Sequence, residues 1–394
     1  MAQPRRSVQS CPHLADTDAR KSAGIARRGG MVAARMIGAD FAEARRILRD
    51  PTARQAGFLA DLVTRFGTMR APVLYLSGAA HRRQRSATAR FFAPRIVTAE
   101  YRALMEQTTD LLVDRLVRDG RADLDTLSLE LAVTVAAEIV GLTDSDPAGM
   151  ATRLERLAGG MQDQTSWPAR LMGYLRGQAR AMNVFYRDVK PAIRARRRAP
   201  REDVVSHLLA EGYNDRQILT ECLTYGAAGM ITTREFITMA GWHLLDRDDL
   251  RQRFLSTDEP GRIALLEEIL RLEPVVGMLY RRLGADEAAR GKGEVIGIDI
   301  RASNADEAVV GRCPHAIDPD RAIAGKVGGA GMAFGDGEHR CPGAQVALQE
   351  SAIFLDRLLR VPNLRLERAP DIGWNALIAG YELRGATLAC GTAS

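Results

Sequence analysis

Hydrophobic positions recur at helical spacing along most of the chain, whereas the alternation typical of strands is confined to short stretches. Long helices are predicted from residue 100 to about residue 195, with breaks at "LTDSDPAG" and "SWPA". Asn214 or Asp215 begins the longest helical pattern, which continues to about Asp246. A further helix, "IALLEEILRLEP", ends at Pro274, because proline cannot continue a helix. The pattern therefore predicts a mainly α protein with small β-sheets.

The remaining segments predict one continuous domain. Asp40 caps the helix "FAEARRILRD", a basic helix "AAHRRQRSATARFFAP" ends at Pro94, and "MVAARMIG" and "GEVIGIDIRAS" predict strands. Residues 303–340 are irregular, and "AQVALQESAIFLDRLLR" then predicts a helix. An irregular segment of this length is unusual in a compact domain unless it has a function, such as wrapping beneath a cofactor. Residues 1–30 are polar and rich in arginine and glycine, so we expect a poorly ordered segment there. Since no repeat or linker is visible in the rest, we expect one domain over residues 31–394.

The composition fits a globular protein of a reducing compartment. Of the 394 residues 46% are hydrophobic and 5% aromatic, which favours helices over a strand-rich sandwich. The five cysteines are widely spaced, so we expect no disulfide framework and a cytoplasmic location. No apolar run is long enough to cross a bilayer, so we expect no membrane partner. The net charge of +6 suits an acidic partner or an anionic ligand, and without interleaved aromatics the arginine clusters do not predict nucleic-acid binding.

One stretch, "FGDGEHRCPG", combines residue types that suit a haem. Cys341 precedes a helix, whose positive end and free backbone N–H groups favour thiolate over thiol. The three glycines let the backbone approach a large flat group. His339 and Arg340 supply donors for anionic propionates, while the thiolate can bind iron. The alternative interpretation is a structural cysteine at a helix cap, with the glycines serving turns.

The stretch resembles the haem-thiolate signature of the cytochromes P-450, Phe-Gly-x-Gly-x-His-x-Cys-x-Gly. The resemblance extends over roughly residues 31–394 and is to the soluble bacterial type. It implies the mainly α, single-domain cytochrome P-450 fold, haem b (iron protoporphyrin IX) as the cofactor, and Cys341 as the iron ligand. The fixed positions of the signature are met by Phe334, Gly335, Gly337, His339, Cys341 and Gly343.

A second motif, "EEILRLEP", matches the Glu-x-x-Arg of the family with Glu268 and Arg271. Their spacing places both side chains on one helix face, where they can pair. The resemblance implies that Arg321 of "IDPDR" joins them in a buried network that fixes the irregular segment under the haem. An ordinary surface pair is the alternative interpretation.

The basic helix carries a third motif, because His81 and Arg85 match the His-x-x-x-Arg of the family. The resemblance implies that both hold haem propionates, together with His339. In "YRRLGAD" it assigns the same role to Arg282, with Arg281 as the weaker candidate. A solvated basic face is the alternative for the arginines of this helix.

A fourth motif, "GAAGMITTREF", resembles the family pattern Ala/Gly-Gly-x-acid-Thr-Thr, which crosses the haem face. It implies that Ala228 and Gly229 leave room for dioxygen and that Thr232 is the catalytic hydroxyl that helps to deliver protons. Ile231 departs from the pattern, because the family usually has an acid there, so the usual proton relay is incomplete. Glu235 lies one helical turn further on, and we expect it to point to solvent rather than to act through a water.

The resemblance implies a monooxygenase, an oxidoreductase that inserts one oxygen atom from dioxygen into a hydrophobic small molecule, as in natural-product tailoring. No nucleotide-binding motif is present, so electrons are expected from an external ferredoxin-type donor. Because of Ile231, two alternatives stay open: a haem-thiolate enzyme with peroxide-driven or oxidative coupling chemistry and, less favoured, a non-catalytic haem sensor. The predicted substrate pocket comprises Ala227, Met230, Ile231, Val275, Val276 and Met278.

Overall fold

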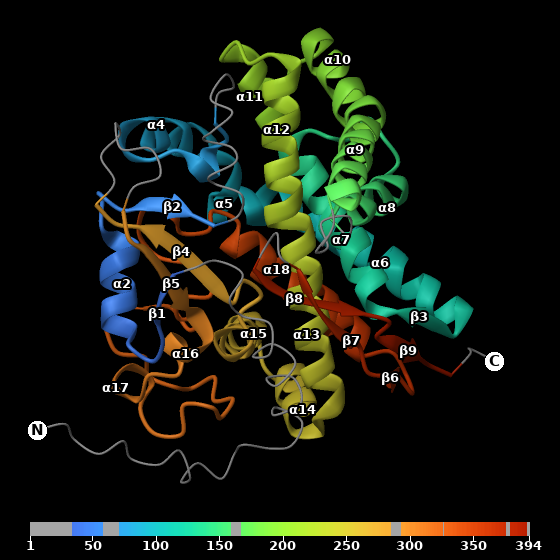
Figure 1. Ribbon diagram of the computed structural model, residues 1–394. Helices are drawn as coiled ribbons and strands as arrows, with labels where there is room; N and C mark the ends of the chain where they lie inside the picture. The colour runs from blue at the N-terminus through green and yellow to red at the C-terminus, as the bar shows by residue number, and fades with distance from the viewer. Residues whose placement is uncertain are drawn as a thin grey trace, which may run out of the picture.

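The computed structural model describes residues 34–57, 71–158, 167–284, 293–325, 327–375 and 379–391. Helices dominate and the sheets are small, as the sequence pattern predicted (Figure 1). The helices are α2 (Phe41–Arg49), α4 (Gly78–Ala89), α5 (Pro94–Ile96), α6 (Arg102–Asp119), α7 (Leu124–Val140), α8 (Pro147–Ala158), α9 (Trp167–Val184), α10 (Lys190–Arg198), α11 (Val204–Ala210), α12 (Asp215–Tyr225), α13 (Thr232–Asp246), α14 (Asp248–Ser256), α15 (Glu259–Leu272), α16 (Ile300–Asn304), α17 (Glu307–Val310) and α18 (Ala344–Leu359).

The longest helical run follows a single axis through the middle of the molecule (Figure 1). It consists of α12, the π-helical turn η5 (Gly226–Ile231) and α13. Asn214 caps it, because its side chain accepts hydrogen bonds from the N–H groups of residues 216 and 217, and the Gln217 side chain accepts from the Asn214 N–H. The predicted start and the predicted end at Asp246 are both confirmed. Helix α13 packs against α7, α15 and α18, so it is buried on almost every side.

The largest sheet lies to one side of this run and has the strand order β1 (Arg35–Ile37), β5 (Val295–Asp299), β4 (Met278–Arg282), β2 (Arg54–Ala56). Strand β1 is parallel to β5, and the other two pairs are antiparallel. The predicted strand "GEVIGIDIRAS" ends at Asp299, because the Asp299 side chain caps α16 by accepting from the Ala302 N–H. The smaller sheets are β3 (Arg121–Asp123) with β9 (Thr387–Ala389) and β6 (Arg365–Arg368), and the pair β7 (Asp371–Asn375) and β8 (Gly380–Arg384).

The hydrophobic core has one main cluster, built around α7, α13, α15 and α18, and a smaller one between α2 and β5. Residues 303–340 are largely irregular, as expected, with α17 and the short turn η6 (Gly337–His339) inside them. No helix of the described residues is long and apolar enough to cross a membrane. The segment over residues 1–30 lies outside the described residues, and the single domain over residues 31–394 stays a prediction.

Candidate functional site

The loop before Cys341 is shaped by two glycines in the left-handed region of backbone space. Gly335 has φ +70° and Gly337 has φ +69°, and a Cβ atom on Gly337 would overlap the Leu48 carbonyl oxygen at the end of α2. Non-glycine residues adopt this conformation only at a cost. The Cys341 N–H donates to the Phe334 carbonyl at 2.8 Å and closes the loop. The glycines of the signature therefore have a local structural reason as well.

Asp336 fixes the loop to α2, and the sequence analysis did not single it out. Its carboxylate pairs with Arg45 at 2.7 Å and with Arg49 at 3.0 Å, and it accepts from the Gly337 N–H at 2.7 Å. These donors hold the pKa of Asp336 below its usual value in spite of burial. The signal in the sequence was two arginines one helical turn apart, but their partner lies almost 300 residues away.

The Cys341 thiol lies at the N-terminal end of α18 in a mixed environment. Burial raises its pKa, while a hydrogen bond from the Gly343 backbone and the charges of Arg85 and Arg340 lower it. The interactions expected to favour the thiolate are therefore present, but in the protein without a bound cofactor burial has the larger effect on the Cys341 pKa. A Cβ atom built on Gly343 would meet no heavy atom of the described residues within 4 Å, so space for a flat group exists beside the thiol.

Two predicted histidines come together beside this loop. The rings of His81 on α4 and His339 lie with centroids 4.3 Å apart. Burial lowers the pKa of His81 and lowers that of His339 to about 3, with further contributions to His339 from Arg281, His81 and Arg85. Within the described residues the buried Nδ1 of His81 has no hydrogen-bond partner. A buried polar atom without a partner is unusual in a protein, so this atom is available for an anionic ligand.

Arginines complete this cationic cluster. Arg85 donates to the Arg340 carbonyl oxygen, and burial lowers the Arg85 pKa while the neighbouring Cys341 raises it. Of the two strand arginines, Arg281 is buried and lies close enough to His339 to lower its pKa. Arg282 is only half-buried and reaches toward the Gly293 carbonyl at 3.4 Å. The placement thus favours Arg281, whereas the motif comparison favoured Arg282, because adjacent strand residues point to opposite faces.

The residues of the fourth motif, in the long central helix, differ in their surroundings: some face open space and others are packed in the core. Ala228 is exposed, and a Cβ atom built on Gly229 would meet no described atom within 4 Å. Thr232 is half-buried, and its hydroxyl donates to the Ala228 carbonyl at 2.6 Å. Met230 and Ile231 are instead packed in the main hydrophobic core.

The predicted pocket walls are therefore only partly supported. Met230 lines a small apolar cavity with Leu154, and the role of Met230 in a substrate pocket stays a prediction. Val275 is buried in the main cluster with Val276 packed against it, and Met278 packs with Tyr280 in a cluster beside β2 and β4. Ala227 lies in η5, and its side chain lies outside the described part of the structure.

The expectation that Glu235 points to solvent is wrong. Its carboxylate is fully buried and pairs with Arg234 at 2.6 Å and with Arg384 at 2.8 Å. It also accepts from the Leu383 backbone N–H at 2.7 Å. The carboxylate therefore ties α13 to β8 and is not available to replace the acid that Ile231 lacks.

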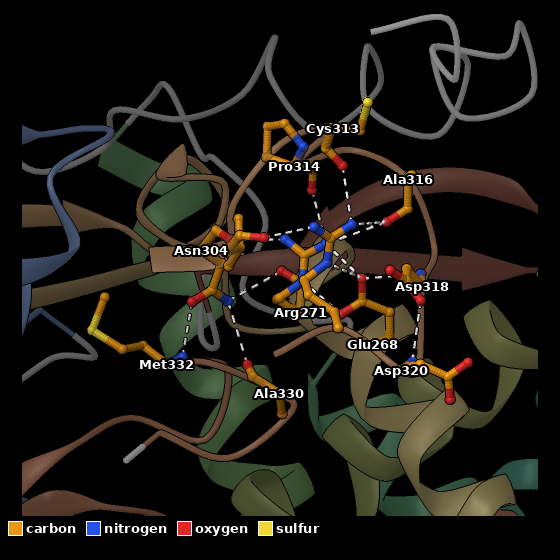
Figure 2. A network of polar contacts seen from close by, with 12 residues as sticks. Glu268, Arg271, Asn304, Cys313, Pro314, Ala316, Asp318, Asp320, Ala330 and Met332 are labelled. Carbon is orange, nitrogen blue, oxygen red and sulfur yellow. Dashed lines mark hydrogen bonds and ion pairs between the residues drawn. The ribbon is translucent and has the colours of Figure 1, made fainter. Parts of the chain in front are cut away.

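The predicted network of Glu268, Arg271 and Arg321 is present and buried, as Figure 2 shows for the residues around Glu268. Arg271 donates from Nε to Glu268 Oε2 at 2.7 Å and from Nη2 to Oε1 at 2.8 Å. Arg321 donates from Nε to the same Oε1 at 3.0 Å. The surface-pair alternative is therefore excluded.

The network reaches the Cys341 loop through Asn304. Arg271 donates to the Asn304 carbonyl at 2.8 Å, and the Asn304 side chain accepts from the Met332 N–H at 2.8 Å (Figure 2). The Met332 carbonyl in turn accepts from the Gly335 N–H at 2.8 Å. Three hydrogen-bonded steps thus connect α15 to the loop, which explains how a distant ion pair can position the cysteine.

The donor set fits a thiolate-ligated haem. A half-buried thiol and a space beside Gly343 would suit iron and a flat ring, and an unpartnered His81 nitrogen, the half-buried Arg85 and the buried Arg281 would suit propionates. Among the described residues no group of three or more histidine, cysteine, aspartate or glutamate side chains lies together in a way that could hold a metal ion.

Known proteins resemble the chain over most of its length. The family model described as cytochrome P-450 matches residues 263–371. Cytochrome P-450 107B1 of Saccharopolyspora erythraea is 28% identical over 367 residues, which cover 88% of this chain and 83% of that protein. Nocardicin C N-oxygenase of Nocardia uniformis is 29% identical over 309 residues, which cover 74% and 72%. The crystal structure of CalO2 superposes with a TM-score of 0.74 at 22% identity and covers 96% of this chain and 97% of its own, which shows a shared fold.

Proposed function

The chain belongs to the cytochrome P-450 family and is a monooxygenase-type oxidoreductase, and on that premise we propose that it inserts one oxygen atom from dioxygen into a largely hydrophobic small molecule. The observation that carries this proposal is the cluster around Cys341. The Cys341 thiol, just before α18, lies near the charge of Arg85, and the buried His81 lies against the half-buried His339 of the same loop.

Each member of the cluster has a distinct task. When bound, haem b supplies the iron that activates dioxygen, and its thiolate ligand favours O–O cleavage. The Cys341 sulfur would hold the iron. His81 and His339 would donate hydrogen bonds to propionates, with Arg85 and Arg281 supplying positive charge. Burial makes such charge-assisted bonds strong, because water competes with them less.

Thr232 would act on the oxygen side. Its hydroxyl currently donates to the Ala228 carbonyl, which leaves the oxygen lone pairs free to accept a hydrogen bond. Rotation about χ1 would instead direct the hydroxyl proton toward the open side formed by Ala228 and Gly229. The π-helical turn just before Thr232 widens the helix at this point, a feature that often marks functional sites.

The substrate class is inferred from apolar surroundings and from a relative. Val275 and Val276 follow α15 directly and are apolar, so a wall that they form would favour a hydrophobic skeleton. One similar protein bears the name of an oxygenase of nocardicin C. Natural-product tailoring is therefore the substrate context that we propose.

An acidic ferredoxin is the proposed electron donor. Arg340 is exposed next to Cys341, and Arg83 is exposed on α4, which carries His81 and Arg85. Arg82, on the same helix, is already paired with Glu338 at 2.9 Å, so it contributes less net charge. Reduction by such a donor should slow steeply as salt rises, because surface charges are screened within about 8–10 Å. A rate that does not change with salt would contradict this docking face.

The test of the proposed function is spectroscopic and isotopic. The reduced carbon monoxide complex should show the thiolate spectrum in the wild type and in Cys390→Ala, a buried control whose thiol contacts the Leu116 carbonyl, and should lose it in Cys341→Ala. Hydrophobic compounds that shift the iron spin state then serve as reporters, and their product under labelled dioxygen should carry one labelled atom. A thiolate spectrum in Cys341→Ala, or product without label, would refute the proposal.

Peroxide-driven or oxidative coupling chemistry is the second candidate, and Ile231 supports it. The position lacks an acid, and Glu235 is committed to Arg234 and Arg384. An enzyme of this kind should convert the same reporter with hydrogen peroxide at least as fast as with a ferredoxin chain. Slow turnover with peroxide and fast turnover with the chain would exclude it.

A further inference from the structure

A continuous helical run on the outside of the molecule carries two apolar stripes instead of one. It comprises α9, the π-helical turn η4 (Phe185–Val189) and α10, which follow one another without a gap over residues 167–198 (Figure 1). The inner stripe is buried in the main hydrophobic core and consists of Val184, Val189, Ala192 and Ile193. A helix needs only one such stripe to pack onto its own protein, so the fold does not account for the second.

The second stripe, called the outer seam below, faces away from the core. Its members are exposed and are spaced alternately three and four residues apart: Met172, Leu175, Ala179, Met182 and Tyr186. Leu175 is 51% exposed and Tyr186 is 57% exposed, which is unusual for large apolar side chains on one line of a helix. Alternate spacings of three and four residues are those of the a and d positions of a coiled coil, so the outer seam has the form of a surface that packs against another helix.

The outer seam is only one line of side chains wide. Exposed polar residues border it on both sides, with Arg176 and Asn183 on one flank and Gln178 on the other. A strict line at these spacings is typical of a contact between two helices, whereas a helix face that packs on a core or lies in a membrane surface is broader. The width of the outer seam therefore fits one partner helix.

The charge around the outer seam indicates the chemistry of that partner. Residues 167–198 contain nine arginine and lysine residues and one aspartate, a net charge of +8, whereas the whole chain has a net charge of +6. The aspartate, Asp188, is buried and accepts from Arg153 at 2.8 Å, so it does not offset the charge of the surface. The Lys190 ammonium lies over the ring of Tyr186, 5.0 Å from its centroid, and adds a cation at one end of the outer seam. Charges beside an apolar line select partners of the opposite sign.

We propose that the outer seam is the docking site for an amphipathic helix of a separate acidic protein, with apolar residues at the same spacing and carboxylates on both flanks. This site is distinct from the face assigned to the electron donor, because Figure 1 shows α4 and α9 on opposite sides of α12. Residues 1–33 are an unsuitable occupant, because they carry six arginine and lysine residues and only two aspartates. A second copy of the chain is also disfavoured, because it would place two strongly basic faces against each other.

The test measures binding of the holoenzyme to a fluorescently labelled synthetic helix by anisotropy. The peptide has about three heptads with leucine at a and d and glutamate at e and g, and its glutamates prevent it from pairing with itself. The wild type should bind it saturably, and the affinity should fall as salt rises. In Leu175→Glu and in Met182→Glu the Kd should rise about tenfold or more, because each change places a carboxylate inside the apolar line opposite the carboxylates of the peptide.

Tyr174→Glu is the matched control. Tyr174 lies on the same helix and is 64% exposed, so the change adds the same charge at a similar exposure, but residue 174 is not part of the outer seam. Its Kd should stay within about twofold of wild type. If Tyr174→Glu weakened binding as much as Leu175→Glu, the attraction would be that of general charge and the proposal would be refuted. Absence of saturable binding up to about 1 mM peptide would refute it as well.

Other occupants of the outer seam give different results. The same variants are compared for sedimentation with vesicles of equal parts phosphatidylcholine and phosphatidylglycerol, for binding to a DNA duplex of arbitrary sequence, and for self-association. Binding to vesicles or DNA that is lost in Leu175→Glu but kept in Tyr174→Glu, or a dimer that Leu175→Glu dissociates, would overturn the proposal. Reduction by a ferredoxin should be unchanged in Leu175→Glu, and a slower rate would show that the outer seam belongs to the electron donor instead. The peptide result does not depend on what the enzyme oxidises, so failure of the proposed function would leave it standing.

Discussion

Replacing Arg271 by alanine should destabilise the fold more than any surface change on the same helix. Arg271 is fully buried, holds Glu268 through two hydrogen bonds, and donates to the carbonyl oxygens of Asn304 and Pro314 at 2.8 Å each. Removing one partner of a buried ion pair costs about 3–5 kcal/mol. Since a domain is stable by only about 5–15 kcal/mol, this single change removes a large part of the total.

The loss of stability in Arg271→Ala has two sources, the Glu268 carboxylate and the two backbone carbonyl groups that Arg271 binds. In Arg271→Ala, Glu268 keeps Arg321 and the Asp318 N–H as partners, so its charge is not left wholly uncompensated. The two carbonyl acceptors do lose their donor, and each unsatisfied buried group costs about 1–3 kcal/mol. We therefore expect a loss of about 3–5 kcal/mol for Arg271→Ala. The double variant with Glu268→Ala should lose less than the two single losses together, because the residues act as one unit.

The assay is denaturant unfolding followed by far-ultraviolet circular dichroism, with haem content measured on the same samples. Arg102→Ala is the matched control, because Arg102 pairs with Glu259 of the same α15 at 2.7 Å but both side chains are 34% exposed. A surface pair of this kind contributes about 0–1 kcal/mol. If Arg271→Ala lost no more stability than Arg102→Ala, and kept full haem content, the argument from burial would fail.

Three further predictions test single positions. Gly337→Ala should lower the melting temperature by several degrees, because Gly337 has a positive φ and a Cβ atom on it would overlap the Leu48 carbonyl. Gly38→Ala is the control and should not lower it, because a Cβ atom on Gly38 meets no atom within 4 Å. Equal shifts in the two variants would contradict the prediction. Thr232→Ala should keep its haem and thiolate spectrum but release more hydrogen peroxide for less product, and unchanged coupling would remove its catalytic role. Burial raises the pKa of Glu350 on α18 to about 8, so the stability that its neutral form confers is present below the unfolded pKa of 4.5 and is lost as pH rises through the folded value. Unfolding titrations should therefore show Glu350→Gln gaining about 4–5 kcal/mol on wild type between those pH values, and a constant difference would refute the buried neutral acid.

Local rules were enough to predict the parts of the site that lie within one segment. The Asn214 cap and the pairing of Glu268 with Arg271 are fixed by residues close together in the sequence, and so is the turn that the Cys341 N–H closes on Phe334. The fold class followed for the same reason, since helical periodicity is a local property. Arg321 joined the trio only through the resemblance, because no periodicity connects residue 321 to residue 268.

Positions decided by distant partners could not be predicted in this way. The choice between Arg281 and Arg282 depends on which face of β4 meets the loop, and that face is set by pairing with β2, where Arg281 lies opposite Gln55. Glu235 was expected in solvent, because its partner Arg384 follows 149 residues later. Burial of a charge is only visible once the partner is known.

Helix α18 connects the Cys341 loop to the long central helix α13. Cys341 lies just before its first turn, and further along the helix Glu350 meets Thr233 of α13. A rigid helix fixes the distance between the Cys341 end and the contact with α13. The loop before the helix is held by Asn304, which the buried network of Arg271 positions. A change in that network should therefore disturb the thiolate spectrum, whereas Glu350→Gln, which leaves the network and the loop in place, should leave that spectrum intact.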